Sequence, residues 1–230
     1  NREGTIWILP AVIRYEFIHD VRPAMEAALQ KLEQRLLWWK PKPGMSLAER
    51  IIDYGEALLT VKEKEKLGRS FEDLGDLSVR IAHFINALLS RHEQVFFGKS
   101  APDKSVPLRI KALRRKCIEL WIDEGLDENK RQAALAGLDD IQLALQLSSY
   151  PGDYVRENPV PERMAETIEK YLEDVFGEAH SIGERRATLS FGPPLNMADY
   201  LKTSQPKSPS PVTAITDDLE QGIQRLMGRG

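Results

Sequence analysis

Apolar and polar residues follow a helical period through most of this 230-residue chain. Between residues 21 and 176, apolar side chains recur every three or four positions in about six runs, and glycine or proline separates most of the runs. Ser46 and Glu49 form a capping-box pattern at the start of one run, and Gly68 stands at its end. The pattern therefore predicts a bundle of about six helices, with short connections between antiparallel neighbours.

Two of the expected helices have limits that depend on single residues. Asp20 and Pro23 are typical of a helix start, and the apolar stripe that follows them extends to Trp39. Ser70 and Asp73 repeat the capping pattern before the third run. We therefore expect the first helix to reach Trp39 and the third to begin near Ser70.

Two short apolar segments have the composition of β-strands. Residues 5–9 read TIWIL and precede Pro10, and residues 186–191 read RATLSF. A run as short and apolar as the first predicts a strand buried on both faces, as in a parallel α/β sheet. We expect both strands to belong to one sheet, with the helical bundle inserted between them.

The predicted organisation is mainly α, with a helical bundle inserted between strands of an incomplete α/β domain. Because the opening strand needs partners that the following helical stretch does not offer, we expect the chain to be the C-terminal part of a larger protein. Residues 204–212 are rich in Ser and Pro, and Thr216 or Asp217 is expected to cap a last amphipathic helix. The predicted segments are a strand segment at 1–18, the bundle at 19–177, a returning strand and short helix at 178–203, and the linker with the last helix at 204–230.

Composition narrows the possible functions. The chain has 32 Lys and Arg against 35 Asp and Glu, a net charge of −3, which does not favour nucleic acid as a partner. Cys117 is the only cysteine, so an internal disulfide is impossible. No run of apolar residues reaches the roughly 18 residues of a membrane span.

The sequence offers no candidate metal or cofactor site and no catalytic motif. The four histidines lack the i, i+4 spacing of a helical zinc site, and no glycine-rich phosphate loop is present. We expect His92 to be either hydrogen-bonded or solvent-facing, and Cys117 to be a small buried residue rather than a nucleophile. Glu63 and Glu65 alternate with lysines and predict a solvated helix face.

Two segments have features of a membrane-binding surface. Residues 36–40 read LLWWK and place two tryptophans beside a lysine. The alternative is a helix end packed on its neighbour, with one tryptophan in the core. A basic stretch on the fourth helix could face anionic lipid or be a solvated face; its residues are Lys104, Arg109, Lys111, Arg114, Arg115 and Lys116.

The two strand segments and the last helix resemble glycerophospholipid acyltransferases. Residues 5–15 (TIWILPAVIRY) resemble the family's apolar strand that ends in a proline, and residues 187–201 (ATLSFGPPLNMADYL) its later strand and short helix. Residues 212–227 resemble its C-terminal helix, and residues 49–68 resemble a helical segment of some bacterial members. The resemblance implies an acyltransferase-like domain and a role in phospholipid biosynthesis.

The resemblance also implies partners and a location. Members related to lysophosphatidic acid acyltransferase move an acyl chain from acyl-CoA or acyl carrier protein to a lysophospholipid or glycerol-phosphate hydroxyl. The resemblance also implies that the protein is peripheral and lies at the cytoplasmic face of the membrane. Pro10 matches the proline that helps form the family's substrate cleft, so it is the one candidate substrate-binding residue; structural support is its alternative role.

The family's catalytic element is absent from this chain. In the family a histidine general base is followed five positions later by the aspartate that orients it. The residues five positions after His19, His83, His92 and His180 are Ala24, Leu88, Phe97 and Arg185. No catalytic residue can therefore be assigned, and we expect the chain alone to be inactive. A non-catalytic helical module for protein interaction or membrane docking remains the alternative.

Overall fold

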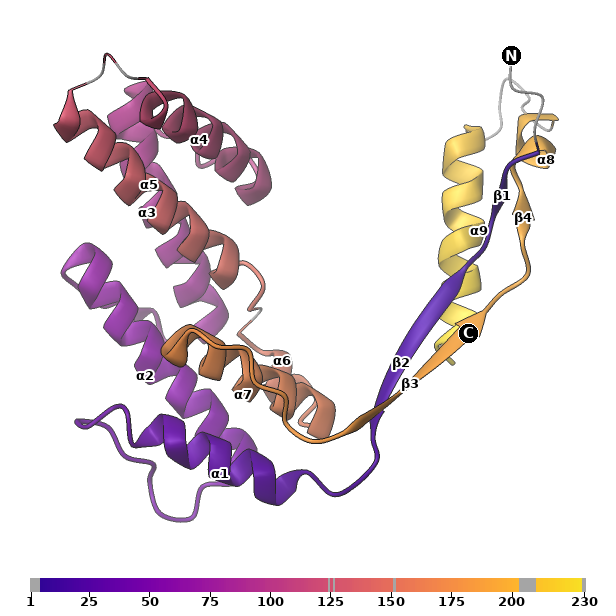
Figure 1. The fold of residues 1–230 in the computed structure, drawn as a ribbon, viewed down its shortest axis with the longest axis horizontal. Coiled ribbons are helices and arrows are strands. Elements are labelled where there is room, and N and C mark those ends of the chain that lie inside the picture. The colour runs from indigo at the N-terminus through magenta and orange to yellow at the C-terminus, as the bar shows by residue number, and fades with distance from the viewer. Residues whose placement is uncertain (1–4, 124, 126, 151, 203–209, 229–230) are drawn as a thin grey trace. The chain divides into compact units, whose positions relative to one another are not determined.

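A computed structural model describes residues 5–123, 125, 127–150, 152–202 and 210–228. The chain divides into two compact units, which are described separately: Asn1–Val21 with Gly183–Gly230, and Arg22–Ile182. Helices dominate the described residues, and strands occur only as two pairs in the first of these units (Figure 1). The predicted mainly helical class is confirmed.

The described residues of the helical unit, Arg22–Ile182, form six long helices. The helices α3, α4 and α5 pack on one another around Phe84, Leu88 and Leu113, whose side chains are inaccessible to solvent. Helix α2 contacts α3, α6 and α7, and α7 also packs on α1 (Figure 1). The elements are α1 (Arg22–Glu33), α2 (Leu47–Leu67), the 3-10 turn η1 (Glu72–Leu74), α3 (Leu77–Phe97), α4 (Val106–Trp121), α5 (Glu128–Leu147), the single-turn α6 (Tyr154–Glu157) and α7 (Pro161–Phe176).

The capping box of α2 forms as the sequence predicts. The Ser46 hydroxyl accepts a hydrogen bond from the Glu49 amide at 3.3 Å, and the Ser46 amide donates to the Glu49 carboxylate at 2.7 Å. Gly68 ends the helix with φ of +70°, a left-handed conformation that glycine adopts without a Cβ clash. Local sequence therefore fixes both ends of α2.

Two predicted helix limits are wrong. Helix α1 ends at Glu33, and Trp39 lies in the following segment with its ring edge-on to Tyr54 at 5.7 Å. The α3 helix begins at Leu77, because the Asp76 carboxylate caps it by accepting hydrogen bonds from two backbone amides. Ser70 instead precedes the separate turn η1. Trp39 in the first place and Phe71 in the second pack on neighbouring elements without continuing a helix.

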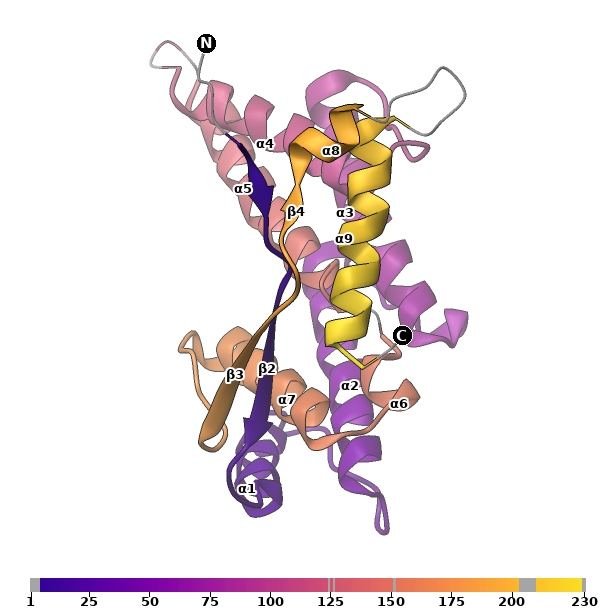
Figure 2. The same ribbon diagram turned by 90° about the vertical axis from the view of Figure 1, so that its right-hand side faces the viewer.

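The smaller unit joins the two ends of the chain. Strand β1 pairs with β4 and β2 with β3, both antiparallel, as Figure 2 shows. The β2–β3 ribbon also contacts α9. The elements are β1 (Trp7–Ile8), β2 (Ala11–Phe17), β3 (Arg185–Phe191), β4 (Leu195–Asn196), α8 (Met197–Lys202) and α9 (Pro211–Leu226).

The prediction that residues 5–9 form a parallel strand buried on both faces is wrong, because β1 pairs antiparallel with β4, and Ile6, Trp7 and Leu9 are 60%, 57% and 51% exposed. The two predicted strands also lie in separate two-stranded sheets and not in one.

The side chains of one face of the β2–β3 ribbon are apolar and exposed, with Ile13 opposite Leu189 and Ala11 opposite Phe191. About half of the surface of Ile13, Leu189 and Phe191 remains accessible, at 54%, 52% and 56%. The alternation of apolar and polar residues along β2 therefore produces an antiparallel ribbon with one unpartnered apolar face.

The last helix begins earlier than predicted. Ser210 is its N-cap and accepts a hydrogen bond from the Thr213 amide at 3.1 Å, so Thr216 and Asp217 lie inside the helix. Residues 203–209, which include most of the predicted linker, lie outside the described residues.

Candidate functional site

The helical unit contains a cavity of about 330 Å³ that opens to solvent. It lies among α2, α3, α5, α6 and α7, and nine of its lining residues are Ile, Leu or Val. These include Ile51, Leu58, Ile81, Leu143, Leu147 and Val155. A concave, mostly apolar site of this size is typical of small-molecule binding.

A close approach of α7 to α2 shapes one side of the cavity. A Cβ built on Gly55 would lie 2.2 Å from the Tyr171 hydroxyl oxygen, so only glycine allows this tyrosine its present position. Tyr171 stacks on Tyr150 with a centroid distance of 6.2 Å, and burial raises the pKa of both phenols. Both hydroxyls therefore stay protonated at neutral pH.

Three lysines line the cavity, and they differ in how firmly they are held. Lys66 bonds to the buried carboxylate of Asp140 at 2.8 Å. Lys170 lies 5.0 Å from the Tyr150 ring centroid and 3.6 Å from a Glu166 oxygen. Lys62 lies 3.4 Å from a Glu65 oxygen and is attracted electrostatically to Asp174, and the side chains of Lys62 and Glu65 are more than one third exposed. Lys62 is thus the cation here that can most easily turn to a ligand.

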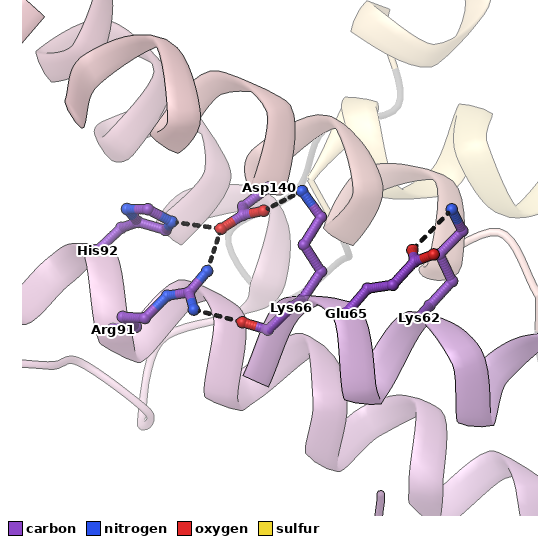
Figure 3. A network of polar contacts seen from close by, with 6 residues as sticks. All are labelled: Lys62, Glu65, Lys66, Arg91, His92 and Asp140. Carbon is purple, nitrogen blue, oxygen red and sulfur yellow. Dashed lines mark hydrogen bonds and ion pairs between the residues drawn. The ribbon is translucent and has the colours of Figure 1, made fainter. Parts of the chain in front are cut away.

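Asp140 on α5 is the centre of a polar network beside the cavity (Figure 3). One oxygen accepts from Lys66, and the other contacts His92 Nε2 at 2.7 Å and the Arg91 guanidinium. Burial raises the pKa of Asp140, but the hydrogen bonds from these three partners outweigh burial and hold its pKa well below the usual range. The carboxylate therefore stays ionised at neutral pH and ties α2, α3 and α5 together.

His92 and Asp140 do not form an accessible catalytic pair. The His92 ring is 8% exposed and stacks on Phe96 with a centroid distance of 5.9 Å. A Cβ on Gly137 would lie 3.5 Å from His92 Nδ1, so the backbone of α5 covers that side of the ring. The expectation that His92 is hydrogen-bonded is confirmed, and its role is to hold the carboxylate.

Cys117 is buried as predicted. Its side chain is inaccessible to solvent and belongs to the core formed by α3, α4 and α5. Burial raises the pKa of its thiol to about 11, which keeps it protonated at neutral pH.

Two charged residues expected at the surface are buried instead. Glu63 has no accessible surface and accepts hydrogen bonds from the Arg80 guanidinium at 2.8 Å and from the Phe71 amide at 2.9 Å. Arg109, expected within the basic stretch, is 3% exposed and pairs with Glu93. The exposed members of that stretch are Lys104, Lys111, Arg114 and Arg115. Local charge alternation cannot reveal such pairs, because their partners lie on other helices.

The LLWWK segment divides between core and surface. Trp39 packs against Tyr54, whereas Leu37 and Trp38 are 88% and 63% exposed. Arg35, Lys40 and Lys42 nearby are also exposed. The prediction that one tryptophan packs inward is confirmed, and the other is free to contact a surface.

Pro10, the predicted substrate-binding residue, lies in the smaller unit. It is buried, and its carbonyl accepts a hydrogen bond from the Gly192 amide at 2.9 Å. A Cβ on Gly192 or Gly222 would lie 3.4 Å from its ring, so Pro10 packs between β3 and α9. The contacts of Pro10 are those of a packing residue, and its role in substrate binding stays a prediction.

The sequence did not single out Asp140 or the aliphatic wall of the cavity. His92 and Asp140 are 48 positions apart, and the wall comes from several helices. The only sequence signal for this site was the spacing of Lys62 and Lys66, which lie one helical turn apart beside the apolar stripe of α2. That signal is too common on helices to identify a site.

Metal binding, membrane spans and similarity to known proteins also bear on function. Within those residues, no cluster of three or more His, Cys, Asp or Glu side chains is arranged to hold a metal ion. None of the helices described has the length and apolar character needed to span a bilayer. Comparisons with protein-family models, curated proteins and solved structures found no match to this chain.

Proposed function

We propose that this chain is the C-terminal portion of a glycerophospholipid acyltransferase. The whole protein transfers a fatty acyl chain from acyl-CoA or acyl carrier protein to a lysophospholipid or glycerol-phosphate hydroxyl. The helical unit is an insertion in its acyltransferase-like domain. The 230 residues by themselves are inactive, because they contain no histidine followed five positions later by aspartate.

The observation that carries the proposal is the exposed apolar face of the β2–β3 ribbon. Ala11, Ile13 and Tyr15 of β2 face Phe191, Leu189 and Ala187 of β3, and all six are exposed. A two-stranded ribbon is marginal in water, and an apolar face of this kind is normally covered by another layer. Further strands and helices of an acyltransferase domain provide such a layer.

The contacts of Pro10 give a second line of support. The three segments that resemble the family, residues 5–15, 187–201 and 212–227, belong to one compact unit although the helical unit separates the first from the others. Pro10 from the first segment packs between Gly192 of the second and Gly222 of the third. This packing is the arrangement expected of neighbouring parts of one domain.

The test is acyl transfer by the native protein that carries this sequence, isolated from its source cells. We expect a mass well above 26.1 kDa and transfer of a labelled acyl group from acyl-CoA or acyl carrier protein to lysophosphatidic acid. The 230-residue chain alone is the matched inactive control. A native protein of 26.1 kDa, or a longer one without transfer to any of these acceptors, would overturn the proposal.

Pro10→Ala in the native enzyme tests the predicted substrate contact. If Pro10 helps form the substrate cleft, KM for the acceptor rises while the unfolding temperature changes little. If it only supports the packing, the unfolding temperature falls and KM stays the same. The two roles therefore give different results in one variant.

A non-catalytic membrane-docking module is the second candidate, and the segment between α1 and α2 favours it. Leu37 and Trp38 are exposed beside Arg35, Lys40 and Lys42, a combination that suits an anionic lipid surface. Binding of the 230-residue chain to phosphatidylglycerol vesicles, lost in Leu37→Ser/Trp38→Ser and retained in Leu108→Ser, would support docking. Equal binding by both variants would contradict it.

A further inference from the structure

We propose that the cavity of the helical unit binds one fatty acyl chain, whose carboxylate or thioester end lies at Lys62. The cavity is built entirely from residues of this unit. The inference therefore concerns binding alone, and it stands whether or not the native protein transfers acyl groups.

The size of the cavity suits a flexible chain. Its volume is about 330 Å³, against roughly 150 Å³ for an engineered cavity that holds benzene between aliphatic and aromatic side chains. A ligand larger than a single ring is thus accommodated, whereas a folded peptide or helix is not. The cavity is partly open to solvent, so a polar head can remain hydrated.

The wall favours an aliphatic ligand over a flat aromatic one. Nine of the lining residues are Ile, Leu or Val, whose side chains offer no planar surface. The lining tyrosines already use their ring faces, because Tyr150 stacks on Tyr171 and also contacts Lys170. Tyr171 contacts Tyr54 as well, at a centroid distance of 5.5 Å. What remains for a ligand is mainly aliphatic surface.

The charges at the cavity favour a single negative charge on the ligand. Lys62 has a surface contact with Glu65 and an electrostatic attraction to Asp174, whereas Lys66, one turn further along α2, bonds directly to the buried Asp140 (Figure 3). Glu173 and Asp174 also line the cavity and disfavour a doubly charged phosphate. A carboxylate fits this balance better than a lysophospholipid head, and an uncharged thioester carbonyl can still accept a hydrogen bond from Lys62.

The first measurement is binding of cis-parinaric acid, a fluorescent fatty acid without an aromatic ring, to the 230-residue chain, followed by fluorescence. We expect the fluorescence of the probe to rise and palmitate to displace it. Palmitoyl-CoA displaces the probe as strongly as palmitate if the protein recognises only the acyl chain. It displaces the probe more weakly than palmitate if the protein prefers a free carboxylate. Lysophosphatidic acid is the weakest competitor. An absence of probe binding, or displacement by lysophosphatidic acid alone, would overturn the inference.

Two pairs of variants locate the site. Leu58→Trp fills the cavity and weakens palmitate binding at least about tenfold, whereas Leu108→Trp, at an exposed position of α4, has no effect. Lys62→Met weakens palmitate binding about threefold and leaves hexadecanol binding unchanged. Lys64→Met, on the exposed side of the same helix, changes neither.

The binding inference can still be tested if circular dichroism shows that Leu58→Trp fails to fold. In that case two results are required. Palmitate has to raise the unfolding temperature of the wild-type chain, and Lys62→Met has to bind palmitate more weakly than Lys64→Met. Equal affinities of those two variants for palmitate would overturn the placement of the carboxylate at Lys62. Failure of palmitate binding leaves the acyl-transfer test untouched, so the two proposals fail separately.

Discussion

Arg109 of α4 and Glu93 of α3 form a buried, two-point ion pair. Arg109 Nε lies 2.9 Å from Glu93 Oε1, and Arg109 Nη2 lies 2.9 Å from Glu93 Oε2. Both side chains are less than 5% exposed, and Arg109 also donates from Nη1 to Asn86 Oδ1 and from Nη2 to Ser90 Oγ. Burial favours a higher pKa for Glu93, but the hydrogen bonds from Arg109 and the Ala101 amide lower it. The pair fixes α4 against α3.

Loss of Arg109 should therefore be costly. In Arg109→Met the Glu93 charge stays buried without its partner, and we expect the free energy of unfolding to fall by about 3–5 kcal/mol in urea titrations. Arg115→Met on the same helix removes only an exposed pair with Glu119 and should cost less than about 1 kcal/mol. Arg109→Met with Glu93→Gln should recover part of the loss. Equal losses for the Arg109 and Arg115 variants would show that the buried pair is not stabilising.

Gly55 should tolerate alanine only when the Tyr171 hydroxyl is removed. The new Cβ of Gly55→Ala meets that oxygen at 2.2 Å, and overpacking of this kind costs about 1–3 kcal/mol. Tyr171→Phe removes the oxygen, so the double variant should regain most of the lost stability, measured by thermal and urea unfolding. The Tyr171→Phe variant alone is the control. If the double variant is no more stable than Gly55→Ala, the clash lies elsewhere.

The Asp140 network predicts a pH dependence with a definite sign. The folded pKa of Asp140 lies well below its unfolded value of about 3.9, so the carboxylate stabilises the fold fully above that value and less as the pH falls below it. Asp140→Asn should lower the free energy of unfolding by about 1–3 kcal/mol at pH 7. The difference from wild type should shrink as the pH falls below about 4.

Asp139→Asn is the matched control for this network, because Asp139 is exposed beside Asp140 on the same helix. The effect of Asp139→Asn on the free energy of unfolding should be small at every pH measured. A difference between Asp140→Asn and wild type that grows as the pH falls would contradict the proposed role of the carboxylate.

The Cys117 thiol should be unreactive in the folded protein. It is buried with its pKa raised to about 11, and thiolate is the reactive form. We expect almost no reaction with Ellman's reagent at pH 8 until denaturant is added, when one thiol per chain reacts. Rapid labelling of the native protein would show that α3, α4 and α5 open readily around this residue.

The sequence by itself determined the local structure of this protein. The capping box at Ser46, the terminating Gly68 and the apolar stripes depend on residues within a few positions of one another, so they can be recognised without the fold. The burial of Cys117 follows in the same way from its place on the apolar face of α4. The start of α3 was missed because Asp76 competes with Ser70 as a cap, and the choice depends on what the intervening turn packs against.

Only the tertiary structure decided which charges are buried and where a ligand can enter. Glu63 has the same local pattern as its solvated neighbours, yet it pairs with Arg80 because α3 crosses α2 at that point. The cavity likewise depends on the Tyr171 hydroxyl meeting Gly55, two residues on different helices. Contacts between distant segments depend on how helices pack, and helix periodicity specifies which face is buried but not which partner covers it.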